Sequence, residues 1–356
     1  MSTFSQVGAA PETRLQPVGP EPGRGLPKGT FLVAAGAFLL TLALLLPLYV
    51  HDRVAPLPAA ASFDLRMTDQ EAAYLDTATW TWVETAELEQ VTRVEASAHG
   101  SDWSAWEMTV STSASDQVID HWSRRVIVDR ETGRAVNCCG EHVNGDRAVR
   151  QAGLVLYWPP GVSEGGHSFY DAEVRSAPSV EFDENDEVAG VPVRRYTQTV
   201  DRTQVPESAR DVPAALFDPG AEGTVRANRW LTAERTFWVE PVTGMVVDMA
   251  ESRSETLRPQ NGSGEVALLD AELTLADGQV SGYAEQARTR SLLLRGLDRW
   301  APWTLGPLGT LAVLAGLVTA WRARPPQEEE TPAATEAEAV EAPEKAPVSE
   351  PEARGP

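Results

Sequence analysis

The sequence predicts an α+β, mostly β protein: a large antiparallel β-rich extracytoplasmic domain held between an N-terminal and a C-terminal transmembrane helix. Two uncharged apolar runs, residues 30–50 and 303–321, are each long enough to cross a bilayer. The stretch between them, residues 51–302, contains short runs of β-branched and aromatic residues separated by Gly, Pro, Asn or Asp, a pattern typical of strands and turns.

The first apolar run is expected to be a membrane anchor. Its 21 residues, at about 1.5 Å each, span roughly 31 Å, which matches the hydrocarbon core of a bilayer. A cleaved signal peptide is the alternative, because Ala59, Ala60 and Ala61 resemble a cleavage site. We favour the anchor because the tail before the run is long and these alanines lie well beyond its apolar end.

The second apolar run has tryptophans near both ends, at Trp300, Trp303 and Trp321. Indole rings favour the membrane–water interface, where the ring is in an apolar region and the N–H remains hydrated. A helix buried in a protein core would not need tryptophans at both borders, so the pattern favours a membrane span.

A ridge of small residues is expected on one face of this second helix. Ala312, Gly316 and Ala320 lie four residues apart, and such spacing lets a second helix approach closely. The first span is the obvious partner. The general abundance of alanine and glycine in the chain is the alternative explanation.

The charges beside the first span predict its orientation. Arg24 and Lys28 precede it, whereas Arg53 with Asp52 follows it. Because positive residues favour the cytoplasmic side, we expect a two-pass protein of the cell membrane with both termini in the cytoplasm and most of the chain outside it.

Both tails are expected to be disordered. Residues 1–29 are rich in proline and glycine, and residues 322–356 are acidic with almost no large apolar side chain. Such segments cannot bury enough apolar surface to offset the entropy lost on ordering. The acidic tail is either a solvating segment or a contact for a partner.

The middle of the chain is expected to form short strands. The clearest apolar runs lie at residues 80–83, 106–110, 126–128, 154–158, 191–196 and 237–239. Apolar and polar residues alternate in the second half of residues 266–275, which predicts an antiparallel strand with one buried face. A juxtamembrane helix is expected at residues 283–300, continuing into the second span.

Two turns resemble each other across the domain. In each, an apolar strand ends in an acid and a Thr-Gly pair closes the turn, at Asp129 to Gly133 and at Glu240 to Gly244. The carboxylate can accept backbone N–H groups, and glycine can adopt positive φ. We interpret both as structural hairpin turns. They belong either to two related halves, residues 62–175 and 176–282, or to one sheet.

Charge and cysteine usage limit the partners. The formal net charge is −22, and a surface this acidic repels nucleic acid, so we expect no nucleic-acid partner. The two cysteines, Cys138 and Cys139, are adjacent. Neighbouring cysteines rarely bridge each other, so we expect thiols or a link between chains more than a redox or metal role.

No arrangement of residues predicts chemistry. The motif of Cys138, Cys139, Glu141 and His142 offers at most three of the about four ligands that zinc needs, and the sequence has no second cysteine pair. Residues 183–187 lack the glycine and the final acid of a calcium loop, so we interpret them as an acidic hairpin turn. Nucleophile elbows and phosphate-binding glycine loops are absent from the sequence. We therefore expect no catalytic, cofactor or metal residues and no enzyme activity; the alternative is an unrecognised hydrolase.

The order of several motifs resembles a known family, the actinobacterial proteins of domain of unknown function 3068, labelled PorA-family porins. The matching features, spread over about residues 25 to 322, are the two spans and residues 128–137, 157–159, 169–171, 190–196 and 238–244. The resemblance implies a membrane-anchored envelope protein of actinobacteria without established catalytic residues.

Two functions remain after these exclusions. The first is a membrane-anchored binding module that handles a lipid or another apolar envelope ligand, suggested by a tryptophan-rich sheet held at the membrane. The alternative is a structural or accessory subunit that contacts other envelope proteins. In both cases we expect the helices, and not a transmembrane β-barrel, to hold the chain in the membrane, because the expected strands are shorter than the roughly ten-residue strands of membrane barrels.

Overall fold

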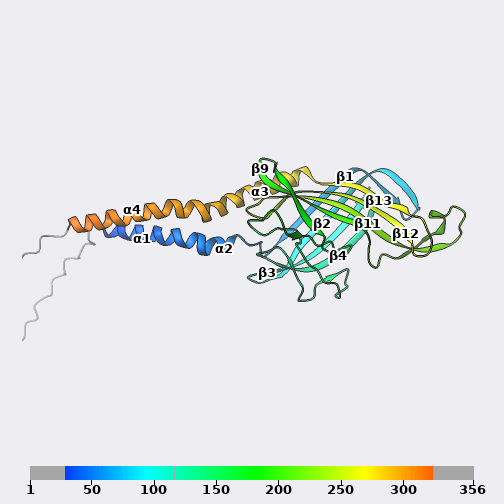
Figure 1. The fold of residues 1–356 in the computed structure, drawn as a ribbon, viewed down its shortest axis with the longest axis horizontal. Helices are drawn as coiled ribbons and strands as arrows, with labels where there is room; N and C mark the ends of the chain where they lie inside the picture. Colours follow the sequence, from blue (N-terminus) through cyan, green and yellow to red (C-terminus); the bar gives the residue numbers. More distant parts are fainter. Residues whose placement is uncertain (1–28, 116, 324–356) are drawn as a thin grey trace, which may run out of the picture.

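The computed structural model describes residues 29–115 and 117–323 and places a β-rich domain at one end of a pair of long helices (Figure 1). The predicted fold class is confirmed: the described chain is mostly antiparallel β, with a helix at each end that is long and apolar enough to span a membrane. The predicted tails, residues 1–29 and 322–356, lie almost entirely outside the described residues.

The N-terminal helix is continuous from Thr30 to Val54, over 25 residues. It consists of α1 (Thr30–Leu45), a π-helical turn η1 (Leu46–Val50) and a last turn α2 (His51–Val54). Its apolar side chains are largely exposed; Phe31, for example, is 83% exposed. A surface of this kind is unfavourable in water and suits a bilayer.

The C-terminal helix is continuous from Asp277 to Arg322, over 46 residues. Its parts are α3 (Asp277–Arg295), a second π-helical turn η3 (Gly296–Trp300) and α4 (Ala301–Arg322). α4 lies antiparallel beside α1, whereas α3 reaches back along the domain (Figure 1). At the ends of the apolar part, Trp303 is 81% and Trp321 72% exposed.

The described part of the domain contains one sheet of 13 strands. Its long strands are β1 (Ser62–Asp76), β2 (Thr81–His99), β3 (Trp103–Ala114), β4 (Gln117–Asp129), β8 (Ser179–Val188), β9 (Val191–Gln204), β11 (Thr224–Val239), β12 (Val246–Pro259) and β13 (Val266–Leu275). The short ones are β5 (Ala135–Val136), β6 (His142–Val143), β7 (His167–Ser168) and β10 (Arg210–Pro213), and a 3₁₀ turn η2 (Ala214–Leu216) follows β10.

The sheet closes on itself at one end. Its strand order is β5-β4-β3-β2-β1-β13-β12-β11-β9-β8-β7, so β5 and β7 are the two edges. Leu154 bridges Arg134, next to β5, and also Phe169, next to β7. This residue therefore joins the two edges and turns the curled sheet of Figure 1 into a barrel at that point.

Helix α3 holds the helices to the sheet. Tyr283 donates its hydroxyl hydrogen to the Asp64 carbonyl oxygen at 3.1 Å, and Gln279 bonds the backbone of both Asp64 and Arg66 at 2.8 Å. Arg288 donates to the carbonyl oxygens of residues 189 and 190 in the β8–β9 turn. We refer to this end of the sheet, where the chain passes between helices and strands, as the helix-proximal end.

A buried aromatic core fills the helix-proximal end. Trp158 is fully buried, with its ring centroid 5.0 Å from that of Phe237 and 5.8 Å from that of Tyr196. Leu57, immediately after the N-terminal helix, packs into the same core. Aromatic side chains of this size bury the largest apolar areas available to a protein, so this end of the sheet is tightly fixed to the helices.

Several details of the strands differ from expectation. The strand at 266–275 is confirmed, but the other strands are much longer than predicted, because polar outward residues conceal their continuation; β2 alone has 19 residues. The expected strand at 154–158 is wrong: this segment is irregular, with two isolated bridges, both at Leu154. Residues 183–187, expected as a hairpin turn, lie within β8, and the turn follows at residues 189–190.

Candidate functional site

The interior of the closed sheet contains a network of buried charges. On β11 and β12 alternate residues face inward, and the alternation brings Arg229, Arg235, Glu251, Arg253 and Glu255 to that side. All five are 7% exposed or less. Arg235 faces Glu251 directly across the two strands, and the small Ala233 opposite Arg253 leaves room for its long side chain.

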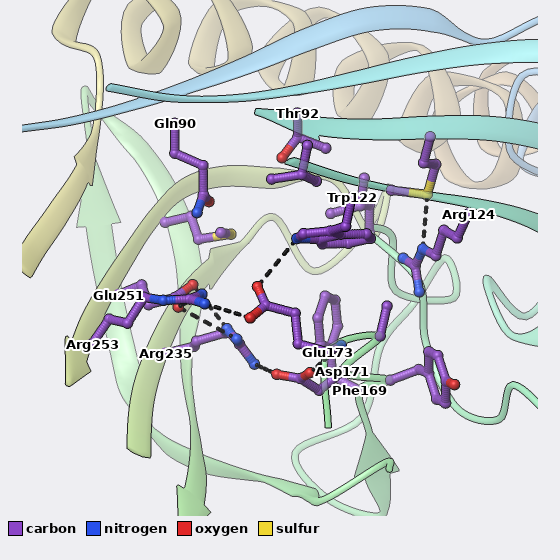
Figure 2. Close-up of a pocket in the computed structure, with 16 residues that line it drawn as sticks. Gln90, Thr92, Trp122, Arg124, Phe169, Asp171, Glu173, Arg235, Glu251 and Arg253 are labelled. Carbon is purple, nitrogen blue, oxygen red and sulfur yellow. Dashed lines mark hydrogen bonds and ion pairs between the residues drawn. The ribbon is translucent and has the colours of Figure 1, made fainter. Parts of the chain in front are cut away.

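A loop between β7 and β8 contributes two further carboxylates to this network. Asp171 accepts the backbone N–H groups of Glu173 and Val174 at 2.8 and 2.9 Å, which fixes the loop in a tight turn. The turn directs both carboxylates into the barrel, as Figure 2 shows for Asp171 and Glu173. We call the seven residues of the loop and the two strands the interior network.

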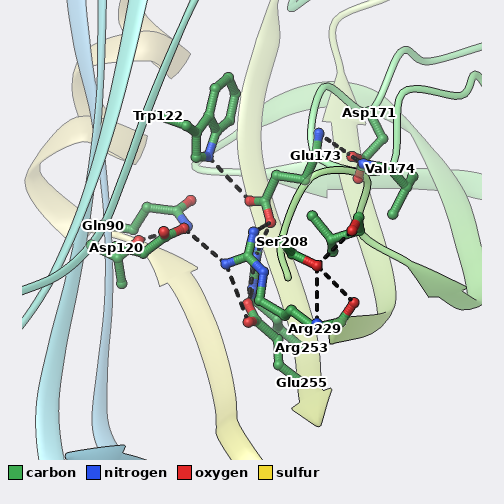
Figure 3. Close-up of polar contacts among 12 residues, drawn as sticks. Gln90, Asp120, Trp122, Asp171, Glu173, Val174, Ser208, Arg229, Arg253 and Glu255 are labelled. Atoms are coloured by element: carbon green, nitrogen blue, oxygen red, sulfur yellow. Dashed lines mark hydrogen bonds and ion pairs between the residues drawn. The ribbon is translucent and has the colours of Figure 1, made fainter. Parts of the chain in front are cut away.

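The ion pairs of the interior network connect all its members. Glu173 pairs with both Arg229 and Arg253 (Figures 2 and 3), and its other oxygen accepts the Trp122 indole N–H at 3.1 Å. Asp171 lies 2.7 Å from an Arg235 nitrogen, and Glu251 bridges Arg235 and Arg253 at 2.9 and 3.1 Å.

The charges stabilise each other's ionised forms. Burial raises the pKa of Glu173, but the positive charges of Arg253 and Arg229 outweigh burial and hold it at about 2, below the ordinary 4.5. Burial also lowers the pKa of Arg253, yet the carboxylates of Glu173, Glu255 and Glu251 raise it well above its ordinary value. Glu173 and Arg253 are therefore both ionised at neutral pH and pair as opposite charges.

Four small cavities surround this network. Their volumes are about 70 Å³ in the centre of the sheet, 30 Å³ under α3, and 40 and 70 Å³ toward the end far from the helices. Bound drug-sized molecules occupy roughly 300–1,000 Å³. A larger depression of about 540 Å³, between Asp69 and Glu272, is an open surface feature. Each of the four cavities is therefore much smaller than a drug-sized ligand.

The two similar turns lie together at the helix-proximal end, where they hold a stretch that we call the crossing segment (residues 154–162). Asp129 accepts the N–H of residue 132 at 2.8 Å, and Glu240 accepts that of residue 243 at 2.8 Å. Gly133 and Gly244 have φ of 69° and 70°. Their carbonyl oxygens accept N–H groups of residues 155 and 158 in the crossing segment, at 3.1 and 2.9 Å.

The closeness of these contacts explains why both positions are glycine. A Cβ on Gly244 would lie 2.0 Å from the Trp158 carbonyl oxygen, and one on Gly133 would lie 2.3 Å from that of Tyr157. The two turns therefore fix the crossing segment across the mouth of the barrel.

Two glycines of α4, Gly316 and Gly309, face α1. A Cβ on Gly316 would lie 2.6 Å from a Val33 methyl carbon, and the backbone nitrogen of Ala320 lies near Gly29. Gly309, which the sequence analysis did not single out, lies against Gly36, with backbone on both sides of the contact: a Cβ on Gly36 would lie 2.6 Å from the Gly309 carbonyl oxygen. The expected helix-packing role of Ala312 stays a prediction.

Other candidates remain separate from the network. Cys138 and Cys139 are free thiols at the surface. The neighbouring Cys139 side chain, together with slight burial, raises the pKa of Cys138 to about 11. In the part of the chain that the structure describes, no three His, Cys, Asp or Glu side chains lie close enough to hold a metal ion.

The sequence analysis missed the interior network. A signal was present: Arg229, Arg235 and Arg253 share the alternation phase of their buried apolar neighbours, such as Leu231 and Phe237. Arginines in that phase point inward and require carboxylate partners. The partners on the loop, however, lie far away in the sequence.

Comparisons with known proteins agree with the fold. A protein-family model described as Porin PorA matches residues 28–318. A curated protein named Porin PorA, from Corynebacterium resistens, is 21% identical over 281 aligned residues, which cover 60% of this chain and 68% of that protein. The match extends from the first apolar helix almost to the end of α4, so it includes both helices and the whole sheet.

Proposed function

The chain belongs to the PorA porin family, and from this premise we propose that it is a two-pass envelope protein whose β domain is a structural or accessory subunit of an envelope assembly. The observation that carries the proposal is the continuous helix Asp277–Arg322, which is part of the domain at one end and of the apolar helix pair at the other. A domain mounted in this way has a fixed position relative to the membrane.

The attachment is reinforced on the other helix. Arg290 of α3 donates to the carbonyl oxygens of Val54, Ala55 and Pro56, at 3.4, 3.1 and 2.7 Å, and thereby caps the end of α2. Arg130 donates to the Leu57 carbonyl oxygen at 2.7 Å and ties the next residues to the sheet. A rigid mount and small internal cavities suit a subunit that presents its surface to partners.

The outward face of the sheet supports placing the helices, and not the strands, in the bilayer. Glu84, Glu87 and Glu95 are exposed on β2, as are Asp270 and Glu272 on β13. Charged side chains facing lipid cost roughly 2–4 kcal/mol each near the bilayer centre for basic residues, and less for acids. The described strands show no outward apolar band of the kind a membrane barrel requires.

We extend the proposal to the topology. The charges around the first span favour both termini, with tails 1–29 and 322–356, in the cytoplasm and the domain outside. We also propose that α1 and α4 pack in the membrane through the small residues Ala312, Gly316 and Ala320. The relation between residues 62–175 and 176–282 as two similar halves stays a prediction. Strands of both ranges belong to one sheet.

Binding of a lipid or other apolar envelope ligand is the second candidate, favoured by the cavity under α3. Phe63, Met67, Phe237, Met249 and Tyr283 are among the side chains that give this cavity an apolar wall. Its volume is about 30 Å³, far below the roughly 300 Å³ of even a small ligand site. A lipid chain would fit only if α3 moved away from the sheet, so we rank this function second.

We propose a non-enzymatic role in both cases. The buried carboxylates are engaged by arginines, and the described residues hold no metal-ligand cluster. The matching family model is described as a porin.

Photo-cross-linking in cells tests the proposal. A cross-linking amino acid is placed in the full-length chain at an outward position on β8 (Glu184) or on β13 (Asp270), and the buried Leu88 serves as the control position. The subunit role predicts a defined protein adduct from at least one outward position and none from Leu88. Absence of a protein adduct, together with a lipid that co-purifies with the chain in native mass spectrometry, would reverse the ranking.

A further inference from the structure

The part of the molecule between the apolar helices and the sheet is basic. We call residues 51–57 and 288–300 the neck; they comprise α2 with the residues that follow it, the end of α3 and the turn η3. Five arginines and two aspartates give the neck a net charge of +3, in a chain whose formal net charge is −22. A basic surface on so acidic a protein favours an anionic partner. The charged residues are Arg53, Arg288, Arg290, Arg295 and Arg299, with Asp52 and Asp298.

Two of these arginines hold the neck to the sheet. Arg290 donates to the carbonyl oxygens at the end of α2, and Arg288 donates to those of the β8–β9 turn. The other three, Arg53, Arg295 and Arg299, lie closer to the apolar part of the helix pair. They are the ones that a ligand at the membrane surface would meet first.

These three side chains are accessible. Arg53 and Arg299 are exposed, and within the described ranges neither has a carboxylate at ion-pair distance. The side chain of Arg295 is 42% exposed, and its nitrogen lies 3.7 Å from an oxygen of the buried Glu240, too far for a good hydrogen bond. All three guanidinium groups therefore retain donors for an anionic group.

The arginines of the C-terminal helix lie at the level of lipid headgroups. Trp300 and Trp303, 56% and 81% exposed, mark the end of its apolar part. At about 1.5 Å per residue, Arg299 lies roughly 6 Å and Arg295 roughly 12 Å beyond Trp303. The headgroup layer adds roughly 5–8 Å on each side of the hydrocarbon core, and a long arginine side chain can bring its charge into that layer.

The N-terminal helix brings Arg53 to the same level. Its guanidinium carbon lies 4.5 Å from the centre of the Tyr49 ring, which is one turn nearer the apolar run and 53% exposed. The turns η1 and η3 contact each other, so Tyr49 and Arg299 belong to neighbouring parts of the two helices. Each helix thus places an arginine next to an exposed aromatic ring, the combination that occurs at membrane interfaces.

Exposed leucines beside the arginines indicate a lipid and not a soluble anion. Leu292 and Leu293, 46% and 51% exposed, lie one turn beyond Arg295 from the apolar part of the helix. Large apolar side chains at this place are unfavourable in water. A lipid offers both a charged group for the arginines and apolar carbon for the leucines.

The two aspartates reduce the positive charge of the neck but do not cancel it. Asp52 lies 3.3 Å from the Nδ1 of His51, and Asp298 is exposed on η3. The five arginines outnumber them, so the potential next to the headgroups remains positive.

We propose that the neck is a docking surface for anionic membrane lipids, whose phosphate groups bind Arg53, Arg295 and Arg299. This inference rests on the proposed span of the bilayer by α1 and α4, and it adds the class of lipid that surrounds them. It does not depend on the orientation of the chain, because the neck lies beside the headgroups of whichever leaflet faces the domain.

Native mass spectrometry of the full-length chain in lipid nanodiscs tests the proposal. Discs contain equal amounts of phosphatidylglycerol and phosphatidylcholine, and the lipids that stay bound after release are counted. We expect phosphatidylglycerol to be enriched, and the enrichment to fall as salt is added. The triple variant Arg53→Gln, Arg295→Gln and Arg299→Gln should lower the apparent affinity for phosphatidylglycerol by about fivefold for each arginine replaced.

A second triple variant controls for net charge. Arg202→Gln, Arg226→Gln and Arg258→Gln remove the same charge from the end of the sheet far from the helices, where each arginine pairs with a carboxylate. This variant should keep the enrichment. An equal loss in both triple variants would show an effect of net charge alone and would overturn the proposal.

The unchanged chain gives a result that needs no variant. Equal retention of the two lipids, after the chain has entered discs of phosphatidylcholine alone, would overturn the lipid site and leave the membrane span intact. A chain that does not enter such discs would overturn the span and this inference with it.

Discussion

Arg229 Nη2 lies 3.0 Å from Glu173 Oε2, although 56 residues separate the two in the sequence. The contact joins β11 to the loop that precedes β8, and the same carboxylate also holds Arg253 of β12. Two strands and one loop thus depend on a single buried side chain. Removing one partner from such a network leaves an uncompensated charge, which typically costs 3–5 kcal/mol.

Glu173→Gln should therefore weaken the fold and change its response to acid. The pKa of Glu173 is about 2 in the folded chain, below its ordinary 4.5, so its contribution to stability is complete above that ordinary value and is lost as the pH falls through the folded one. The difference corresponds to roughly 3 kcal/mol. Urea unfolding at pH 7, 4.5 and 3 should show a large loss at pH 7 that shrinks at pH 3. Glu234→Gln changes an exposed position on β11. Its free energy of unfolding should depend on pH in the same way as that of the unchanged chain.

Gly244→Ala should destabilise the helix-proximal end. The new Cβ would lie 2.0 Å from the Trp158 carbonyl oxygen, and the residue would have to keep a φ of about 70°. We expect a loss of at least about 3 kcal/mol in the free energy of unfolding. Gly145→Ala is the matched control, because it has a φ of 81° but open space around the added Cβ. It should cost only about 1 kcal/mol, for the backbone alone; equal losses would contradict the role of the close contact.

Gly36→Leu should separate the two apolar helices. Its Cβ would lie 2.6 Å from the Gly309 carbonyl oxygen, so backbone would have to move. Spin labels at the exposed positions 31 and 321, in a cysteine-free chain, should report a longer and broader distance by electron–electron double resonance. Gly306→Leu, where nothing lies within 4 Å of the added Cβ, should leave the distance unchanged. An unchanged distance in Gly36→Leu would exclude close packing at this point.

Arg290→Met should loosen the segment that leads from α2 into the sheet. The guanidinium of Arg290 satisfies three carbonyl oxygens at the end of α2, and a methionine supplies none of those hydrogen bonds. Amide hydrogen exchange should accelerate around residues 54–57 while the strands remain protected. Arg288→Met serves as the control, because the side-chain hydrogen bonds of Arg288 go to the β8–β9 turn; faster exchange of residues 54–57 in that variant would argue against a specific cap.

The local features of the fold were predictable from sequence. The two apolar helices follow from uncharged runs, and β13 follows from alternation within residues 266–275, because each signal lies in a single stretch of chain. Strand lengths were underestimated since long strands such as β2 place glutamates outward at alternate positions, which conceals the strand pattern. The apolar run at 154–158 resembled a strand. Its backbone is irregular because it hydrogen-bonds to the two Thr-Gly turns while its side chains pack in the aromatic core.

The interior network could not be derived in the same way. Arg235 pairs with Asp171 in a loop before β8, and Arg229 pairs with Asp120 on β4, 109 residues away. Such pairs depend on how the sheet curls and closes, because β1 pairs with β13 and so joins the first and the last strands of the chain within one sheet. One sequence contains the charges but not the register that brings them together.

The continuous helix from Asp277 to Arg322 makes the domain sensitive to the thickness of the membrane. At about 1.5 Å per residue it is a rod of roughly 69 Å, with the sheet fixed along α3 and the lipid-facing surface along α4. Helices adjust to a thinner or thicker bilayer by changing their tilt. Because α3 is fixed to the sheet, such an adjustment would lean the whole domain relative to the membrane.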